Sequence, residues 1–152
     1  MTSVNGLPGT PVEPVRSDHI AGLLGLVMAR LRAEILADSE QAFPGLRISH
    51  YRLLEMIPAD GGRITDLAEA AGMTKQGLGQ HVDYLQRLGF TESDRLRGDR
   101  RVRLVRRTPR GDEAVEFSRA AIARVEELWE QQLGRERYDV LRETLRDLGD
   151  AP

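Results

Sequence analysis

Apolar residues recur at intervals of three and four along most of this chain, the spacing that places them on one face of an α-helix. Stretches with this spacing cover residues 17–41, 49–57, 65–71, 75–88 and 109–133, and Tyr138, Leu141, Leu145 and Leu148 mark a last one. Ser17 stands where it would cap the first helix, and Phe43-Pro44-Gly45 is expected to end it. The protein is therefore predicted to be mainly α-helical.

One part of the chain has a period of two instead. Side chains alternate over residues 90–96 and 102–107, and Arg97-Gly98-Asp99-Arg100 lies between them. Alternation on both sides of a glycine-containing turn predicts a small β-hairpin, here with a basic tip. Residues 1–16 are rich in glycine and proline without apolar periodicity, and we expect them to form a disordered tail.

Residues 64–85 meet the requirements of a helix-turn-helix. Gly72 tolerates the positive φ of the tight turn, Met73 is expected to plug the junction of the two helices, and Thr74 is expected to cap the second helix. The expected buried positions are Leu67, Ala68 and Ala71 in the first helix and Leu78, Val82 and Leu85 in the second.

The outer face of the second helix carries side chains suited to reading DNA. With Leu78 inward, 100° per residue turns Gln76, Gln80, Asp83 and Arg87 outward and leaves Lys75 and Gly79 on the flank. Glutamine can form two hydrogen bonds with adenine, and lysine can contact guanine or phosphate. The alternative is a solvated helix face. Gly77 and Gly79 each cost about 1 kcal/mol relative to alanine; they either permit close approach of DNA or are tolerated because the inner face anchors the helix.

Charge is unevenly distributed along the chain. The net charge is −2, yet residues 95–110 hold eight arginines and one acid, Asp99, a local charge of +7. Such a cluster indicates a polyanion-binding segment, and an arginine at the tip of a β-ribbon can enter the narrow minor groove of DNA. Asp99 would orient an arginine through a two-point contact; otherwise residues 97–100 are simply a soluble turn. The candidate DNA contacts are Thr74, Lys75, Gln76, Gly79, Gln80, Arg87, Arg97, Asp99, Arg100 and Arg101.

Residues 17–149 resemble the MarR family, the multiple antibiotic resistance regulators. The similarity rests on ITDLAEAAGMTKQGLGQHVDYLQRLGF, on Asp99-Arg100-Arg101 and on TPRG at residues 108–111, at the spacing of the family. It implies a winged helix-turn-helix homodimer that regulates transcription, as a repressor, from a pseudo-palindromic operator. Arg100 or Arg101 would enter the minor groove, with Asp99 as its brace. Two positions depart from the family pattern: Ser93 replaces a usual arginine, which would weaken a phosphate contact, and Arg107 replaces a usual leucine.

We therefore expect a winged helix-turn-helix DNA-binding lobe at residues 46–107 and a helical dimerisation layer at residues 17–45 and 108–150. The long helices carry more apolar surface than a lobe of this size can cover. A second copy of the chain is the commonest cover for such a surface, and an ordinary bundle within one chain is the alternative.

Composition argues against other classes of protein. The chain has no cysteine, which excludes disulfides and thiolate metal sites and fits a reducing cytoplasm. We recognise no signal peptide or membrane-spanning stretch. The histidines at 19, 50 and 81 lack metal-ligand spacing, and no nucleophile elbow or phosphate loop occurs. We expect a cytoplasmic DNA-binding protein without enzyme activity, metal or cofactor, whose partners are double-stranded DNA and itself. A winged-helix module that binds a partner protein is the alternative.

A small aromatic or phenolic effector is a further expectation. The family resemblance implies a cleft between the dimerisation layer and the winged lobe. Arg30, His50 and Tyr51 could offer it a cation, a switchable imidazole and a hydroxyl, a set suited to an anionic aromatic ligand. The alternatives are that Tyr51 belongs to the core, that Arg30 is a solvated flank, and that the regulator has no small-molecule effector.

Overall fold

The structure, a computed structural model, describes residues 18–96 and 98–150, apart from the side chain of Arg100. The predicted tail at residues 1–16, the predicted cap Ser17 and the candidate contact Arg97 lie outside the described residues. In chain order the elements are α1 (Ile20–Leu36), α2 (Ser39–Ala42), α3 (Ile48–Met56), β1 (Gly62–Arg63), α4 (Ile64–Ala70), α5 (Lys75–Arg87), β2 (Thr91–Leu96), β3 (Asp99–Arg107), α6 (Pro109–Leu133) and α7 (Arg135–Gly149).

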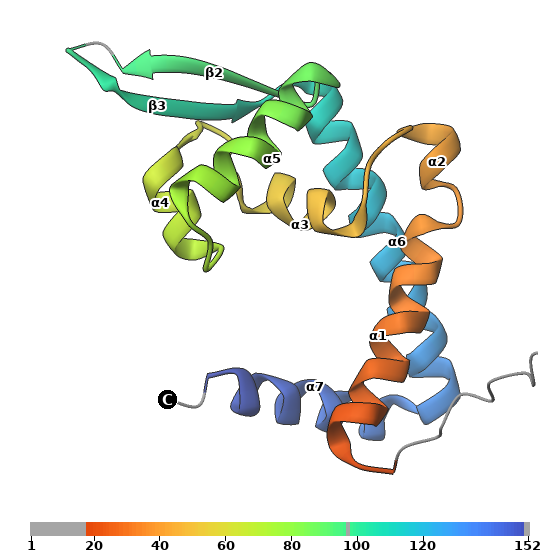
Figure 1. The fold of residues 1–152 in the computed structure, drawn as a ribbon. Helices are drawn as coiled ribbons and strands as arrows, with labels where there is room; N and C mark the ends of the chain where they lie inside the picture. Colours follow the sequence, from red (N-terminus) through yellow and green to blue (C-terminus); the bar gives the residue numbers. More distant parts are fainter. Residues whose placement is uncertain (1–17, 97, 151–152) are drawn as a thin grey trace, which may run out of the picture.

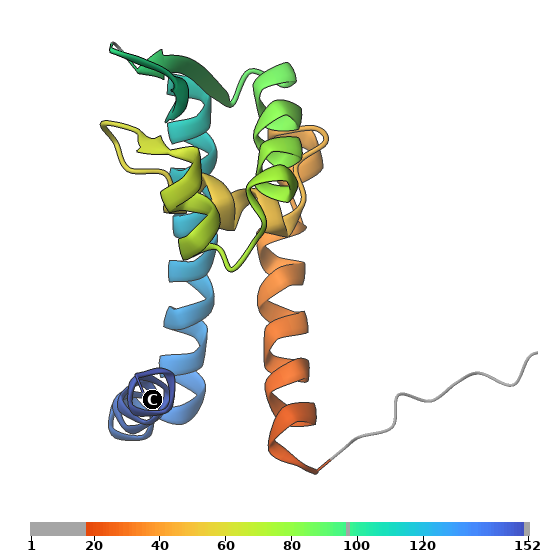
Figure 2. The same ribbon diagram turned by 60° about the vertical axis from the view of Figure 1, so that its left-hand side comes forward.

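Most of the short elements cluster at one end of the molecule, and long helices extend from this cluster. The helices α3, α4 and α5 and the three strands gather at one end, and we call this group the winged lobe (Figure 1). From it α1 and α6 extend side by side, and α7 crosses the far end of α6, as both views show (Figure 2). The mainly α-helical fold with a small antiparallel sheet confirms the predicted fold class.

The predicted first helix is in fact two helices. It is interrupted at Ala37 and Asp38, so that α2 begins at Ser39. The buried Ser39 hydroxyl is 2.6 Å from the Tyr51 hydroxyl of α3, a tertiary contact that apolar periodicity does not encode. His19 caps α1, because its Nδ1 accepts a hydrogen bond from the Gly22 N–H at 3.0 Å.

The sheet contains the predicted hairpin and one strand more. The strand order is β1-β3-β2, all antiparallel, and Gly98 turns the hairpin with φ of 99°. The strand β1, for which no prediction was made, pairs Gly62 with Val105 and Arg63 with Leu104. Two residues are too few to show a period of two, so this strand could not be recognised from the sequence pattern.

The core lies in the winged lobe and continues between α1 and α6. Its large fully buried apolar side chains come from α3, α5, β3, α6 and the loops: Leu54, Ile57, Leu78, Val82, Leu85, Phe90, Val105, Val115 and Val125. Burial of one such side chain contributes about 1.5–3 kcal/mol. Phe43 fastens the α2 segment to this core, with its ring edge-on to Phe90 at 6.0 Å and to Phe117 at 5.4 Å. Among the described residues, no helix combines the length and the apolar character needed to cross a membrane.

Candidate nucleic-acid interface

The helix-turn-helix is formed by α4, a tight turn and α5. Gly72 has φ of 63°, as the turn requires. The Thr74 hydroxyl caps α5 by accepting a hydrogen bond from the Gly77 N–H at 3.0 Å. Leu78, Val82 and Leu85 are fully buried, as predicted. Met73 was expected to plug the junction of the two helices, but it is 36% exposed and lines a cavity that α1 and α3 also border.

The opposite face of α5 is open to solvent. The exposed residues along it are Thr74, Lys75, Gln76, Gln80, Asp83 and Arg87, and Gly79 is half-buried beside them. Arg87 also lies 5.8 Å from the centroid of the Tyr84 ring, a cation–π distance. This face therefore presents amide and cationic side chains, while the opposite face of α5 is buried in the core and holds the helix in place.

The wing presents two kinds of arginine. Arg95 and Arg101 are exposed, whereas Arg106 is paired with Asp94 at 3.3 Å and also bonds the Asp60 carbonyl. Arg103 reaches across to α5, where its guanidinium is 2.7 Å from the Asp83 carboxylate. Part of the arginine cluster thus holds the wing in place, and the rest faces solvent.

Asp99 has a local role at the tip. Its carboxylate accepts a hydrogen bond from the Arg101 backbone N–H at 2.9 Å and has no ion pair with any side chain that the structure describes. The side chains of Arg97 and Arg100, the other arginines of the tip, are not among these. Asp99 therefore orders the backbone of the turn, and the expected two-point contact with an arginine remains a prediction.

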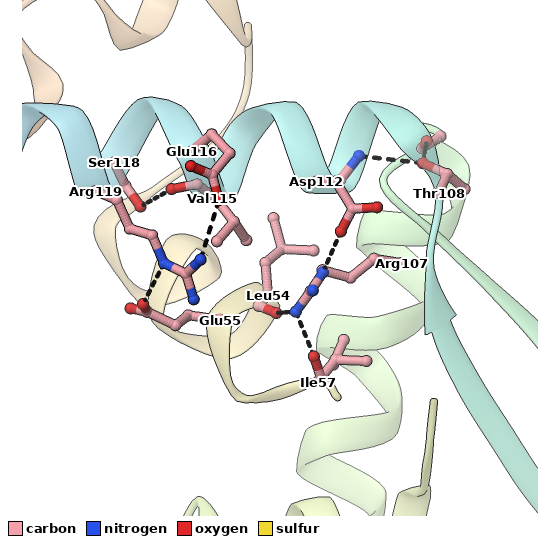
Figure 3. A network of polar contacts seen from close by, with 12 residues as sticks. Leu54, Glu55, Ile57, Arg107, Thr108, Asp112, Val115, Glu116, Ser118 and Arg119 are labelled. Atoms are coloured by element: carbon pink, nitrogen blue, oxygen red, sulfur yellow. Dashed lines mark hydrogen bonds and ion pairs between the residues drawn. The ribbon is translucent and has the colours of Figure 1, made fainter. Parts of the chain in front are cut away.

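Arg107, one of the two departures from the family pattern, fastens the base of the wing (Figure 3). Its Nη1 donates to the carbonyl oxygens of Leu54, at 3.0 Å, and Ile57, and its Nε donates to the Asp112 carboxylate at 2.6 Å. The side chain is only 13% exposed. The Leu54 carbonyl also accepts the Ile57 N–H at 3.2 Å, so Arg107 adds a second donor to it and ties the end of α3 to the wing, while Asp112 neutralises the charge of Arg107.

His50 belongs to the core of the winged lobe. It is buried, its Nδ1 accepts a hydrogen bond from the Arg47 N–H at 3.1 Å, and its ring stacks on Tyr84 of α5 at 5.0 Å. The half-buried His81 packs edge-on at 5.7 Å, as a packing residue should. Burial, and then the charges of His81 and Arg47, lower the pKa of His50 below its ordinary value. The neutral imidazole is therefore the form that this fold favours.

A cavity of about 470 Å³ lies between α1, α3, α6 and the helix-turn-helix. The candidate Tyr51 lines it, but the candidates Arg30 and His50 are not among its lining residues. The arginines that line it are Arg32 and Arg52, and neither was a candidate from the sequence. The sequence offered one indication of Arg52, because this residue directly follows Tyr51, which was a candidate. The Tyr51 hydroxyl is bonded to Ser39, and burial raises its pKa, so Tyr51 stays protonated. No three His, Asp or Glu side chains converge on a metal-sized site in the described part of the chain.

Comparison with known proteins gives matches among solved structures alone. No protein-family model matches the sequence, and no curated protein does. The crystal structure of MarR has a TM-score of 0.72 at 21% identity, covering 86% of this chain and 95% of that one. FabT from Streptococcus pneumoniae, in complex with DNA, has a TM-score of 0.72 at 18% identity, covering 83% and 89%. CouR from Rhodococcus jostii RHA1, bound to p-coumaroyl-CoA, has a TM-score of 0.66 at 19% identity, covering 91% and 96%. This chain therefore has the winged helix-turn-helix fold of the MarR-family transcriptional regulators.

Proposed function

We propose that this protein is a transcriptional regulator, a repressor, that binds a pseudo-palindromic DNA operator as a homodimer. The observation that carries this proposal is the exposed row of Lys75, Gln76, Gln80 and Arg87 on α5 beside a wing with exposed Arg95 and Arg101. Amides on a helix in the major groove can read base edges, and the wing arginines supply charge for the backbone. The solved FabT structure of the same fold contains DNA.

Selection of bound sequences from random duplex DNA, followed by affinity measurements at several salt concentrations, tests the proposal. A two-fold dimer should select two half-sites about one helical turn apart. Logarithmic affinity should fall steeply with logarithmic salt concentration, by nearly one unit of slope for each neutralised phosphate. Affinity that is independent of salt would contradict DNA binding and favour the alternative, a module that binds a partner protein.

The two glutamines of α5 are proposed to read bases. Gln76→Ala or Gln80→Ala should relax the preference at particular base pairs and cost on the order of 1–3 kcal/mol where a two-point contact is lost. Gln131→Ala, an exposed glutamine on α6, is the matched control and should leave the selected sequence unchanged. Identical sequence preferences in all three variants would contradict the role of α5.

The homodimer is proposed because large apolar side chains are exposed away from the winged lobe. Apart from Met73, every strongly exposed large apolar residue that the structure describes lies on α1, α6 or α7. A patch of this kind marks an interaction surface, and a two-fold copy of the chain would cover it on both molecules at once. In this arrangement, residues 17–45 and 108–150 form the dimerisation layer and residues 46–107 form the DNA-binding lobe.

An anionic aromatic effector is proposed for the cavity beside Tyr51. Apolar side chains of α1, α3 and α6 form most of its wall, and the guanidinium groups of Arg32 and Arg52 can balance a carboxylate. CouR, which has the same fold, was solved with p-coumaroyl-CoA, an aromatic thioester that carries phosphates. Operator release and thermal shift with a panel of phenolic acids would test this. Arg52→Gln should lose both responses, whereas Arg30→Gln, outside the cavity lining, should keep them. A lack of response in the wild type would indicate a regulator without this kind of effector.

A further inference from the structure

On the proposal that this protein binds DNA, we infer that the groove between α5 and the wing holds one backbone phosphate of the duplex. The seat would be formed by Arg103, Arg95, Arg87 and the hydroxyl of Ser93. Three of these four residues lie outside the contacts expected from the sequence. The groove itself is lined by Asp83, Gln86 and Arg87 of α5 and by Ser93, Asp94, Arg95 and Arg103 of the wing.

Position makes duplex DNA the fitting occupant of this groove. Asp83 and Arg87 lie on the same exposed face of α5 as Gln76 and Gln80. The strands β2 and β3 run alongside the C-terminal part of α5 (Figure 1). When α5 enters a major groove, the backbone strand that borders this groove comes to lie between the helix and the wing. A phosphate there fixes the register of the protein without reading sequence.

The charge balance of the groove favours an anion. Both of its carboxylates already have partners: Asp83 pairs with Arg103 at 2.7 Å, and Asp94 pairs with Arg106 at 3.3 Å. Arg87 and Arg95 form no ion pair with any residue that the structure describes. Two positive charges therefore remain uncompensated in a concave strip, and this is where a phosphate is attracted.

Arg103 is held ready for such a contact. Its Nη2 donates both to the Asp83 carboxylate at 2.7 Å and to the Gln86 side-chain oxygen at 3.3 Å. Its Nε and Nη1 donate to no residue in the described ranges, and the side chain is 19% exposed. An arginine that is already fixed by one nitrogen loses less side-chain freedom on binding, and its planar group suits phosphate. Asp83 is thereby a positioning residue rather than a repulsive charge on the DNA-facing side.

The hydroxyl of Ser93 is a second group of the groove that a phosphate could bind. Its hydroxyl oxygen is the one buried side-chain polar atom without a hydrogen bond in the part of the chain that the structure describes. A buried hydroxyl without a partner is costly, and a phosphate oxygen in the groove would accept its hydrogen bond. Ser93 had been expected to weaken phosphate contact because it replaces an arginine. Arg103 of the neighbouring strand brings a guanidinium to the same groove and compensates for that loss.

The test compares the wild type with Asp83→Asn/Arg103→Gln, a double substitution that removes the guanidinium without changing the net charge. Duplexes of the selected operator, each with one phosphate replaced by a neutral methylphosphonate, locate the phosphate that occupies the seat. Neutralising it should weaken wild-type binding on the order of tenfold and weaken the binding of the double variant less, because only Arg87, Arg95 and Ser93 then remain to hold the phosphate. Arg95→Gln, which removes one of the two uncompensated charges of the groove, should lose up to about one unit of the salt-dependence slope per lobe. Glu116→Gln/Arg119→Gln is a charge-neutral exchange on α6, away from the groove, that also removes the 3.0 Å contact of Arg119 with Glu55; it should keep the methylphosphonate profile of the wild type.

The outcomes separate this inference from the proposed function. If the wild type binds no duplex in a salt-dependent way, the proposed function fails. If the wild type binds, and neither the double variant nor Arg95→Gln changes the methylphosphonate profile, the groove holds no phosphate although DNA binding stands. Circular dichroism checks that the variant folds. If the double variant does not fold, the same comparison is made with Arg95→Gln. The exposed side chain of Arg95 has no partner among the described residues.

Discussion

At the scale of single residues, His50 joins two helices of the winged lobe. Its ring stacks on Tyr84 of α5, and the Tyr84 hydroxyl in turn donates to the Gly45 carbonyl at 2.9 Å. His50 Nδ1 accepts the Arg47 N–H at the start of α3. The hydrogen bond from Arg47 needs the neutral ring, since a proton on Nδ1 would remove the acceptor. The protonation of one side chain is thereby linked to the way α5 is held.

We expect the protein to lose stability in mild acid through His50. Its folded-state pKa is lowered by burial, whereas the unfolded chain titrates near its ordinary value of about 6.5. Because the unfolded state then binds the proton more readily, this contribution is complete above that value and declines as the pH falls towards 5. Its slope is at most about 1.4 kcal/mol per pH unit. Urea unfolding at pH 8, 7, 6 and 5 measures it.

The matched variant is His50→Gln, which keeps an acceptor for the Arg47 N–H but cannot titrate. It should flatten the dependence of the unfolding free energy on pH between 7 and 5, although it is less stable than the wild type at pH 8 because the stacked ring is lost. An equal acid dependence in the variant and the wild type would show that other groups are responsible.

The roles of single residues could be predicted from the sequence where they depend only on the local backbone conformation. The positive φ of Gly72 and the cap of Thr74 follow from local rules and are confirmed. The cavity arginines were not predictable in this way, because Arg30 and Arg32 are both near the apolar stripe of α1 and only the packing of α3 selects Arg32. Arg107 was recognised as a departure from the family pattern, but its carbonyl partners lie about 50 residues earlier in the chain.

At the scale of elements, α5 combines a strong inner anchor with two glycines near its start. A Cβ at Gly79 would meet the Ile64 Cδ1 at 3.9 Å, an ordinary contact. A Cβ at Gly77 would come within 3.1 Å of the Thr74 hydroxyl that caps the helix. Packing therefore supplies a reason for the small residue at 77 and none at 79.

Gly79→Ala should stabilise the protein by roughly 0.5–1 kcal/mol, because alanine is the better helix former. Gly77→Ala should gain less, because the cap must shift to make room. Thermal and urea unfolding of the two variants measure this difference. Gly79→Ala should also bind the operator more weakly, since Gly79 is proposed to let DNA approach the backbone. Unchanged affinity in a stabilised Gly79→Ala would show that this glycine is neutral for DNA binding.

Helices with a periodic apolar face were predictable from the sequence, and the two shortest elements, α2 and β1, were not. The helices α3, α4, α5 and α6 begin and end within one residue of the prediction, because their apolar faces, caps and flanking turns agree. The division of α1 from α2 depends on the Ser39–Tyr51 hydrogen bond, and the strand β1 depends on pairing with β3. Both depend on contacts between residues far apart in the chain, and no local pattern reports such contacts.

At the scale of the whole molecule, the winged lobe buries its apolar side chains, whereas the helices beyond it leave large apolar side chains exposed. On α1, Ile20, Leu23, Leu24 and Val27 repeat at intervals of three and four and are all at least 43% exposed. On α7, Tyr138 is buried against the molecule, but Leu145 and Leu148 remain 47% and 66% exposed. The sequence indicated this uncovered stripe, and the arrangement in Figure 2 places both helices at the end away from the wing. The spacing of two wings on DNA would therefore be set at that end.

Leu145→Glu should convert the proposed dimer to a monomer without unfolding the chain. The side chain is half exposed in one copy, so little packing is lost there, but it would place a charge in a two-fold interface on both copies. With about 2 kcal/mol lost per leucine, two copies weaken association roughly a thousandfold. Analytical ultracentrifugation should report the monomer mass, and operator affinity should fall because one lobe binds only one half-site. Ala70→Glu adds the same charge at an exposed position of α4 and should remain dimeric. A dimer that survives Leu145→Glu with its affinity intact would place the interface elsewhere than on α7.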